Sequence, residues 1–117
     1  MKSNVRAAVA AMAIAHARGR SVSSVYDYKN SCHVNISANV SGNTINGYDY
    51  GSSCHFGGSF PGMYHYGTGK HIDLNITGGG KYSGYDYDTS SHFEVTVRGN
   101  NADIYDYGES AHFSYSA

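Results

Sequence analysis

Tyrosine, aspartate and histidine recur along the chain in a fixed arrangement of hydroxyl, carboxylate and imidazole groups. Tyr-x-Tyr followed by four residues and a histidine occurs five times, and the starts lie 22, 16, 21 and 20 residues apart. Imidazole and carboxylate groups bind metal ions and transfer protons, so the repeat raises the question of a metal site or a catalytic site. The repeated residues are Tyr26, Tyr28, Tyr48, Tyr50, Tyr64, Tyr66, Tyr85, Tyr87, Tyr105, Tyr107, His33, His55, His71, His92, His112, Asp27, Asp49, Asp86 and Asp106, with His65 at the aspartate position of the third copy.

Catalysis is not what this arrangement predicts. An active site brings different groups to one unique point, whereas these groups recur as equivalent copies. The sequence has no phosphate-binding glycine loop after a strand, no nucleophile elbow and no H-E-x-x-H motif. We therefore expect that the protein is not an enzyme and has no catalytic residues.

The repeated histidines predict a structural ladder and not a metal site. Neighbouring imidazoles can share a zinc or copper ion. A metal site, however, needs converging ligands held by further hydrogen bonds, and a row of histidines beside serine and asparagine is typical of a hydrogen-bonded ladder. We expect neither a bound metal ion nor a cofactor.

The elements that position these residues are short strands. After the histidine, apolar and polar residues alternate, as in residues 71–76 and 92–97. A period of two is typical of a half-buried strand, and Tyr-x-Tyr is a second, shorter strand. Glycine, serine, asparagine, aspartate and threonine separate the two strands and close each repeat, as turn residues do. A repeat of about 20 residues therefore predicts strand, arc, strand and turn.

Repeats of this length predict an all-β protein, a five-rung β-solenoid with two strands per rung over residues 21–117. Stacked rungs place matched positions in columns, and contacts between like side chains along a column favour identical residues there. We expect the aliphatic and tyrosine columns to be buried or half-buried and the aspartate column to be solvated. The alternative, in which the aspartates of Tyr-x-Tyr point inward, stays open because the length of the arc does not fix which face is buried. The alternative is an antiparallel meander in which each repeat is a hairpin and the sheet closes into a barrel or a sandwich.

Cys32 and Cys54 each precede a repeat histidine, in the first and second copies. In a solenoid they occupy one column, and adjacent rungs place their Cα atoms within the span of a disulfide. We expect a disulfide between Cys32 and Cys54 in an oxidising compartment. The alternative is two stacked free thiols.

Residues 1–20 form a separate segment. Lys2 and Arg6 precede an alanine-rich run at residues 7–17 that ends in Ala-His-Ala, as a secretory signal does. The alternative is a short helix that stays attached and covers the first rung. No membrane span is expected, because about 18 to 20 uninterrupted apolar residues are needed.

The tandem strand-arc-strand units of residues 25–117 resemble the curli class of bacterial amyloid fibre subunits. The resemblance is architectural, because the chain contains no glutamine and has tyrosine, aspartate and histidine where curli has ladders of serine, glutamine, glycine and asparagine. It implies a two-sheet solenoid and a role in an extracellular matrix fibre, and it transfers no functional residue.

The repeats and this resemblance together predict a secreted structural subunit of a self-assembling bacterial fibre. Growth would proceed by end-to-end stacking of rungs, because the last rung ends without a cap and an open sheet edge is a template for another chain. The partners would be copies of the protein itself and not nucleic acid, since the formal net charge is -1. The alternative function is a monomeric solenoid that binds a metal ion, a glycan or ice.

Overall fold

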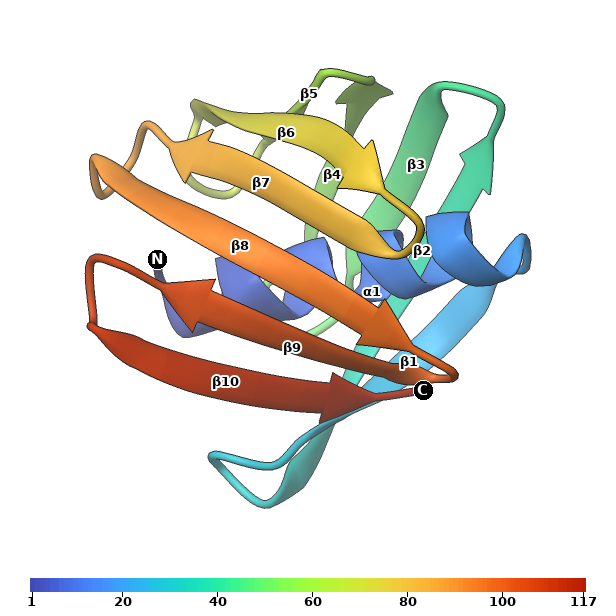
Figure 1. Ribbon diagram of the computed structural model, residues 1–117, viewed down its shortest axis with the longest axis horizontal. Helices are drawn as coiled ribbons and strands as arrows, with labels where there is room; N and C mark the ends of the chain where they lie inside the picture. Colours follow the sequence, from blue (N-terminus) through green and yellow to red (C-terminus); the bar gives the residue numbers. More distant parts are fainter.

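The computed structural model describes residues 1–117, which form one helix and ten strands. The elements are α1 Ser3–Arg18, β1 Val22–Asp27, β2 Cys32–Ser41, β3 Thr44–Asp49, β4 Cys54–Ser59, β5 Gly62–His65, β6 Lys70–Gly78, β7 Lys81–Asp86, β8 Ser91–Arg98, β9 Asn101–Asp106 and β10 Ala111–Ser116. Consecutive strands pair antiparallel, and β1 also pairs with β10, so the sheet closes into a barrel around α1 (Figure 1). The molecule measures 31 × 29 × 29 Å.

The predicted β-solenoid is wrong, because the sheet is a closed antiparallel barrel of ten strands. The all-β class and the N-terminal helix are confirmed, and the observed topology is the closed meander that the repeats left as the alternative. Each repeat forms one hairpin, and the five hairpins β1–β2, β3–β4, β5–β6, β7–β8 and β9–β10 stand side by side around the barrel. Every strand has a neighbour on both sides, so the barrel has no rung end on which further rungs could stack.

One turn is built five times, and it explains why residues at matched positions are identical. The central residue of Tyr-x-Tyr ends the first strand of the hairpin, and four residues separate it from the second strand. In the first copy the Asp27 carboxylate accepts a 3.0 Å hydrogen bond from the Lys29 N–H, and Ser31 has a φ of 52°. The same carboxylate bond recurs at Asp49, Asp86 and Asp106, and the left-handed residue recurs as Ser53, Gly69, Ser90 and Ser110. Shared turn chemistry therefore accounts for the repeat without stacked columns.

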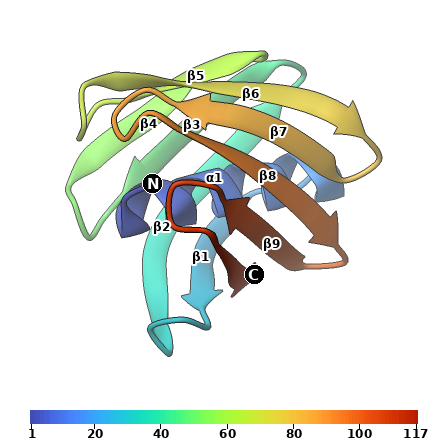
Figure 2. The same ribbon diagram turned by 60° about the vertical axis from the view of Figure 1, so that its left-hand side comes forward.

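The interior of the barrel is filled by α1. Every residue from Val5 to Ala15 is buried, and six of these are alanines. Apart from Arg6, the buried residues of α1 are apolar on all sides of the helix, as in a helix of a protein core, and small side chains let it fit inside a narrow barrel. In two views α1 crosses the space that the strands enclose, so it fills the barrel and does not cover a first rung (Figure 1 and Figure 2). No helix of the structure has the length and apolar composition needed to cross a membrane.

Inward-facing side chains of the strands complete the core around α1. Buried and exposed residues alternate along β8, as the period of two predicts. Glycine on a neighbouring strand leaves room for a phenylalanine ring. Gly84 pairs with Phe93, and a Cβ added to this glycine would lie 2.5 Å from the Cζ of the ring. Gly47 and Phe56 repeat this close contact between β3 and β4.

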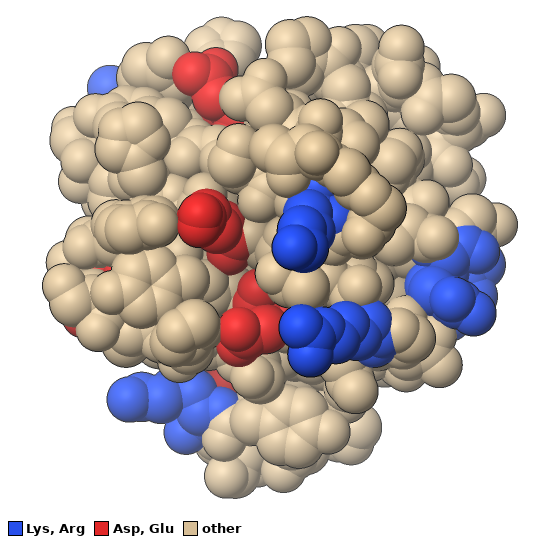
Figure 3. All heavy atoms as spheres, viewed as in Figure 1, with Lys and Arg blue, Asp and Glu red and all other residues tan.

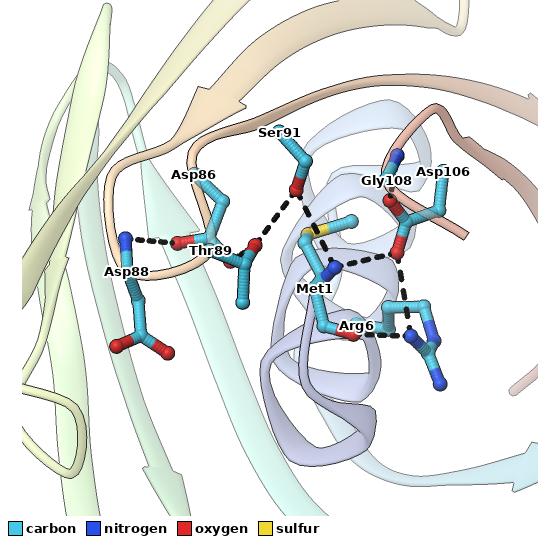
Figure 4. Close-up of polar contacts among 8 residues, drawn as sticks. All are labelled: Met1, Arg6, Asp86, Asp88, Thr89, Ser91, Asp106 and Gly108. Atoms are coloured by element: carbon cyan, nitrogen blue, oxygen red, sulfur yellow. Dashed lines mark hydrogen bonds and ion pairs between the residues drawn. The ribbon is translucent and has the colours of Figure 1, made fainter. Parts of the chain in front are cut away.

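Four carboxylates and one imidazole line the end of the barrel that holds the N-terminus of α1. They are the central residues of the five Tyr-x-Tyr segments, each at most 2% exposed: Asp27, Asp49, His65, Asp86 and Asp106. The four aspartates are therefore buried, and the prediction that they are solvated is wrong. Carboxylates are stabilised near the positive end of a helix dipole. Asp106 also accepts a 2.7 Å contact from the Met1 amino group, as Figure 4 shows.

Candidate functional site

The outward-facing residues of the repeats form an aromatic belt around one end of the barrel. In the fourth hairpin the ring centroid of Tyr85 lies 4.7 Å from that of His92 and 4.9 Å from that of Tyr87. Across all five hairpins these separations are 4.6–4.9 Å and 4.7–5.0 Å, and the rings meet edge to face. We use the term aromatic belt for the two tyrosines and the histidine of each repeat.

The two tyrosines of each repeat differ in exposure. The first stands opposite the histidine of the same hairpin, as Tyr85 stands opposite His92, and is half-buried. The second lies in the turn and is 49–64% exposed: Tyr28, Tyr50, Tyr66, Tyr87 and Tyr107. The predicted half-burial of the tyrosines is therefore found only for the first tyrosine of each pair. Because side chains alternate along a strand, burial of the central aspartate places both flanking tyrosines on the outer face.

A large groove lies over the second hairpin, between Ser37 of the first hairpin and Tyr66 of the third. It is open to solvent and has a volume of about 880 Å³. Tyr48 and His55 come from the second hairpin and Tyr66 from the third, while Ser37 and Asn46 add polar groups. Tyr48 pairs with Ser37 on one side and with His55 on the other, so these three residues form a row on the outer face. We name this the first groove.

A second groove repeats this construction two hairpins further along the barrel. It has a volume of about 460 Å³ and is lined by Tyr85 and His92 of the fourth hairpin and by Tyr107 of the fifth. Asp73 stands opposite Tyr85 in the row, and Glu94 also lines the groove. In both grooves a tyrosine–histidine row from one hairpin is joined by an exposed tyrosine from the next.

Carboxylates hold two of the exposed tyrosine hydroxyls. The Tyr87 hydroxyl donates to Asp73 Oδ2 at 2.8 Å, and the Tyr107 hydroxyl donates to Glu94 Oε2 at 3.2 Å. These hydrogen bonds are the main cause that raises the pKa of both tyrosines above the ordinary value. Asp73 and Glu94 each follow a repeat histidine by two residues, and the repeat pattern did not single them out. Their shared offset from the histidine is the signal that could have identified them.

The repeat histidines and the repeat aspartates lie on opposite faces of the sheet. All five histidines are exposed on the outer face, each on its own hairpin and each in contact with a tyrosine ring. The four aspartates face the interior. The repeated imidazole and carboxylate groups therefore do not converge on one point of the outer surface.

Cys32 and Cys54 are free thiols, so the expected disulfide is not formed. The two residues begin β2 and β4, and β3 lies between these strands. Strands two positions apart in a sheet are separated by about 9 to 10 Å. A disulfide requires Cα atoms within about 7 Å. The expectation depended on stacked rungs, whereas the barrel sets the first two hairpins side by side.

No protein-family model, curated protein or solved structure matches the chain. The belt and its grooves are therefore the basis for a function. Both grooves combine aromatic rings with an imidazole and with hydroxyl, amide or carboxylate groups.

Proposed function

We propose that the protein is a binding module for neutral glycans, which lie in the grooves of the aromatic belt. The observation that carries the proposal is the repetition of one groove construction, a tyrosine–histidine row joined by an exposed tyrosine, at two places around the barrel. A binding surface that repeats suits a ligand that also repeats, such as a polysaccharide, because several weak contacts then act together.

The grooves offer the chemical groups that a sugar needs. A sugar ring has a face of C–H groups, which packs on an aromatic ring, and hydroxyls that donate and accept hydrogen bonds. In the first groove Tyr66 is 64% exposed and offers its ring, while Ser37 and Asn46 offer polar partners. In the second groove the carboxylates of Asp73 and Glu94 are acceptors for sugar hydroxyls.

The expected ligand is uncharged. The formal net charge of the chain is -1, and Figure 3 shows charged side chains scattered over a face made mostly of uncharged residues. Surfaces that bind nucleic acids or other polyanions concentrate basic residues on one face. Ice requires a flat and regular face, whereas the belt is grooved and follows a curved barrel. Among the ligands considered for a binding module, the belt therefore favours a glycan.

Isothermal titration calorimetry with neutral oligosaccharides of different linkage, such as cellohexaose, maltohexaose and chitohexaose, tests the proposal. Tyr66→Ala removes the exposed ring of the first groove and is expected to weaken binding about 10-fold, equivalent to about 1.4 kcal/mol. Tyr66→Phe keeps the ring and is expected to bind nearly as well as the wild type. Ile76→Ala is the matched control, because Ile76 is 47% exposed and lines neither groove. Absence of binding to all three sugars at millimolar concentration, or an equal loss in Ile76→Ala, would contradict the proposal.

The fibre role predicted from the repeats remains a prediction with its own test. Growth by rung stacking is not part of the present proposal, because the closed barrel has no rung end. Sedimentation velocity at increasing protein concentration separates the two functions. A monomer at all concentrations supports the binding module, whereas large self-assembled species without added sugar would favour the fibre.

A further inference from the structure

Asp49, Cys54 and His65 meet where the second and third hairpins adjoin. Asp49 ends β3, Cys54 stands opposite it at the start of β4, and His65 ends β5 beside β4. One carboxylate oxygen, the thiol sulfur and one ring nitrogen lie within 4.8 Å of one another. Asp49 and His65 are buried, and Cys54 is half-buried. The cluster therefore lies just beneath the outer surface.

Two of these residues have buried polar atoms without a hydrogen-bond partner. Asp49 is 1% exposed, and its Oδ2 is unpartnered, although Oδ1 accepts hydrogen bonds from the N–H groups of Gly51 and Ser52. His65 is 0% exposed, and its Nε2 is unpartnered, while Nδ1 accepts a long 3.3 Å bond from the Thr68 N–H. An unpartnered buried polar atom costs about 1–3 kcal/mol. A bound cation would give the Asp49 oxygen and a His65 nitrogen a partner.

The first hairpin contains the same aspartate–cysteine pair without these features. Cys32 stands opposite Asp27, as in the cluster. Both carboxylate oxygens of Asp27 accept hydrogen bonds, Oδ1 within the turn and Oδ2 from Asn30 Nδ2 at 2.8 Å. Among the five buried residues at the centre of Tyr-x-Tyr, His65 is the one histidine. The departure from the repeat at this position supplies the nitrogen that the first hairpin lacks.

We propose that Asp49, Cys54 and His65 bind a zinc ion. Sulfur, imidazole nitrogen and carboxylate oxygen together are typical zinc ligands, whereas calcium and magnesium prefer oxygen alone. Ligand atoms around tetrahedral zinc lie about 3.3–3.6 Å apart for bonds of about 2.0–2.3 Å, so the separations of up to 4.8 Å close by about 1 Å on binding. Cys54 lines the first groove, which gives the ion an entry path and leaves the fourth position to water or a ligand.

The hydrogen bonds of the cluster allow coordination at little cost. Asp49 can bind through Oδ2 while Oδ1 keeps its bonds to the turn, and these bonds orient the carboxylate as a ligand. If His65 binds through Nε2, the ring proton moves to Nδ1 and the long bond from Thr68 is lost. If it binds through Nδ1, the ion takes the place of that bond. In either case one weak contact is exchanged for a metal–nitrogen bond.

Zinc binding would be coupled to loss of the thiol proton of Cys54, because thiolate is the form of cysteine that binds a metal ion.

Titration of the untagged chain with Zn²⁺ by calorimetry, and with Co²⁺ by absorption spectroscopy, tests the proposal. The expected result is one tightly bound ion per chain and a thiolate-to-cobalt charge-transfer band. Cys54→Ser and His65→Asn are expected to weaken Zn²⁺ binding by at least about 100-fold, since changes beside a metal ligand already cost 10–100-fold. Cys54→Ser also removes the band. His65→Asn adds no carboxylate to the cluster, and its amide oxygen can accept a turn hydrogen bond as the aspartates of the other four hairpins do.

Cys32→Ser is the matched control, because Cys32 has the same place in its hairpin without the histidine. It is expected to keep the affinity, the stoichiometry and the charge-transfer band. Circular dichroism verifies the fold of each variant. The proposal is overturned if the wild type binds no Zn²⁺ at micromolar concentration, if folded Cys54→Ser and His65→Asn bind as the wild type does, or if Cys32→Ser loses binding equally.

Discussion

The guanidinium group of Arg6 on α1 lies 3.3 Å from the carboxylate of Asp106 at the end of β9, inside the barrel (Figure 4). The two side chains are 10% and 0% exposed, and the guanidinium also lies 3.7 Å from the ring centre of Phe113. This ion pair joins the helix to β9, the strand that leads into the fifth turn.

Asp106→Asn is expected to destabilise the protein by about 3–5 kcal/mol, because it leaves the buried charges of Arg6 and of the Met1 amino group without their partner. The amide oxygen can still accept the turn hydrogen bond from the Gly108 N–H. Asp88→Asn is the control, since the partner Lys2 is 59% exposed and a surface pair contributes at most about 1 kcal/mol. Urea unfolding measures both variants, and equal losses would refute a special role for the Arg6–Asp106 pair.

Ala11→Leu is expected to destabilise the barrel by about 1–3 kcal/mol, because Ala11 is 0% exposed and added methylene groups in a packed core force side chains and backbone to shift. Arg18→Leu places the same side chain at an exposed position of α1 and is expected to change stability by less than about 0.5 kcal/mol. Thermal unfolding of the two variants tests whether α1 is packed inside the strands. Similar midpoints for both would show that it is not.

Gly84→Ala is expected to destabilise the protein by about 1–3 kcal/mol, because its Cβ would lie 2.0 Å from the Asp73 carbonyl oxygen and 2.5 Å from the Phe93 ring. Gly79→Ala is the matched control in a turn, where a Cβ meets nothing within 4 Å. Loss of backbone freedom in the unfolded chain predicts a gain of about 0.4–1 kcal/mol for this control. Urea unfolding compares the free energies of unfolding of the two variants. A Gly84→Ala protein as stable as the wild type would contradict the close contact between Gly84 and Phe93.

Stability is expected to fall as the pH rises from about 10 to 12. Burial raises the pKa of Tyr82 and of Tyr115 to about 12. The folded protein therefore keeps two protons that the unfolded chain loses near pH 10, so each tyrosine costs up to about 1.4 kcal/mol per pH unit above that value. Urea unfolding at several pH values measures the slope. Tyr82→Phe should reduce it, while Tyr28→Phe, at an exposed position, should not. An unchanged slope in Tyr82→Phe would count against the burial of this hydroxyl.

The local structure was predictable from the sequence, and the global topology was not. Turn residues around Ser31 or Ser90 and the alternation after each histidine identify the strands and hairpins. Whether those hairpins stack as rungs or close side by side depends on what fills the interior. The filling element is α1, and its alanines read equally well as part of a secretory signal.

The prediction that the central residue of Tyr-x-Tyr faces solvent is wrong, because this residue faces the interior of the barrel. Burial of a carboxylate such as Asp27 costs free energy unless it is hydrogen-bonded, and this cost favoured the tyrosines as the core residues. The turn N–H groups and the helix N-terminus offset the cost, and neither is visible in the repeat itself. For the cluster of Asp49, Cys54 and His65, the usable signal was His65, the one departure from aspartate in the series.

Closure of the barrel by pairing Tyr26 with Ser116 has a consequence for the order of folding. The helix leaves the ribosome before the strands, and its cover is complete only after β10 has been synthesised. Until then α1 is open to solvent and to chaperones. The pairing of β1 with β10, which closes the barrel, joins distant parts of the chain. Such non-local closure makes folding slow and post-translational. Excess production at high temperature should therefore yield aggregates formed during folding, even though the finished barrel has no free edge.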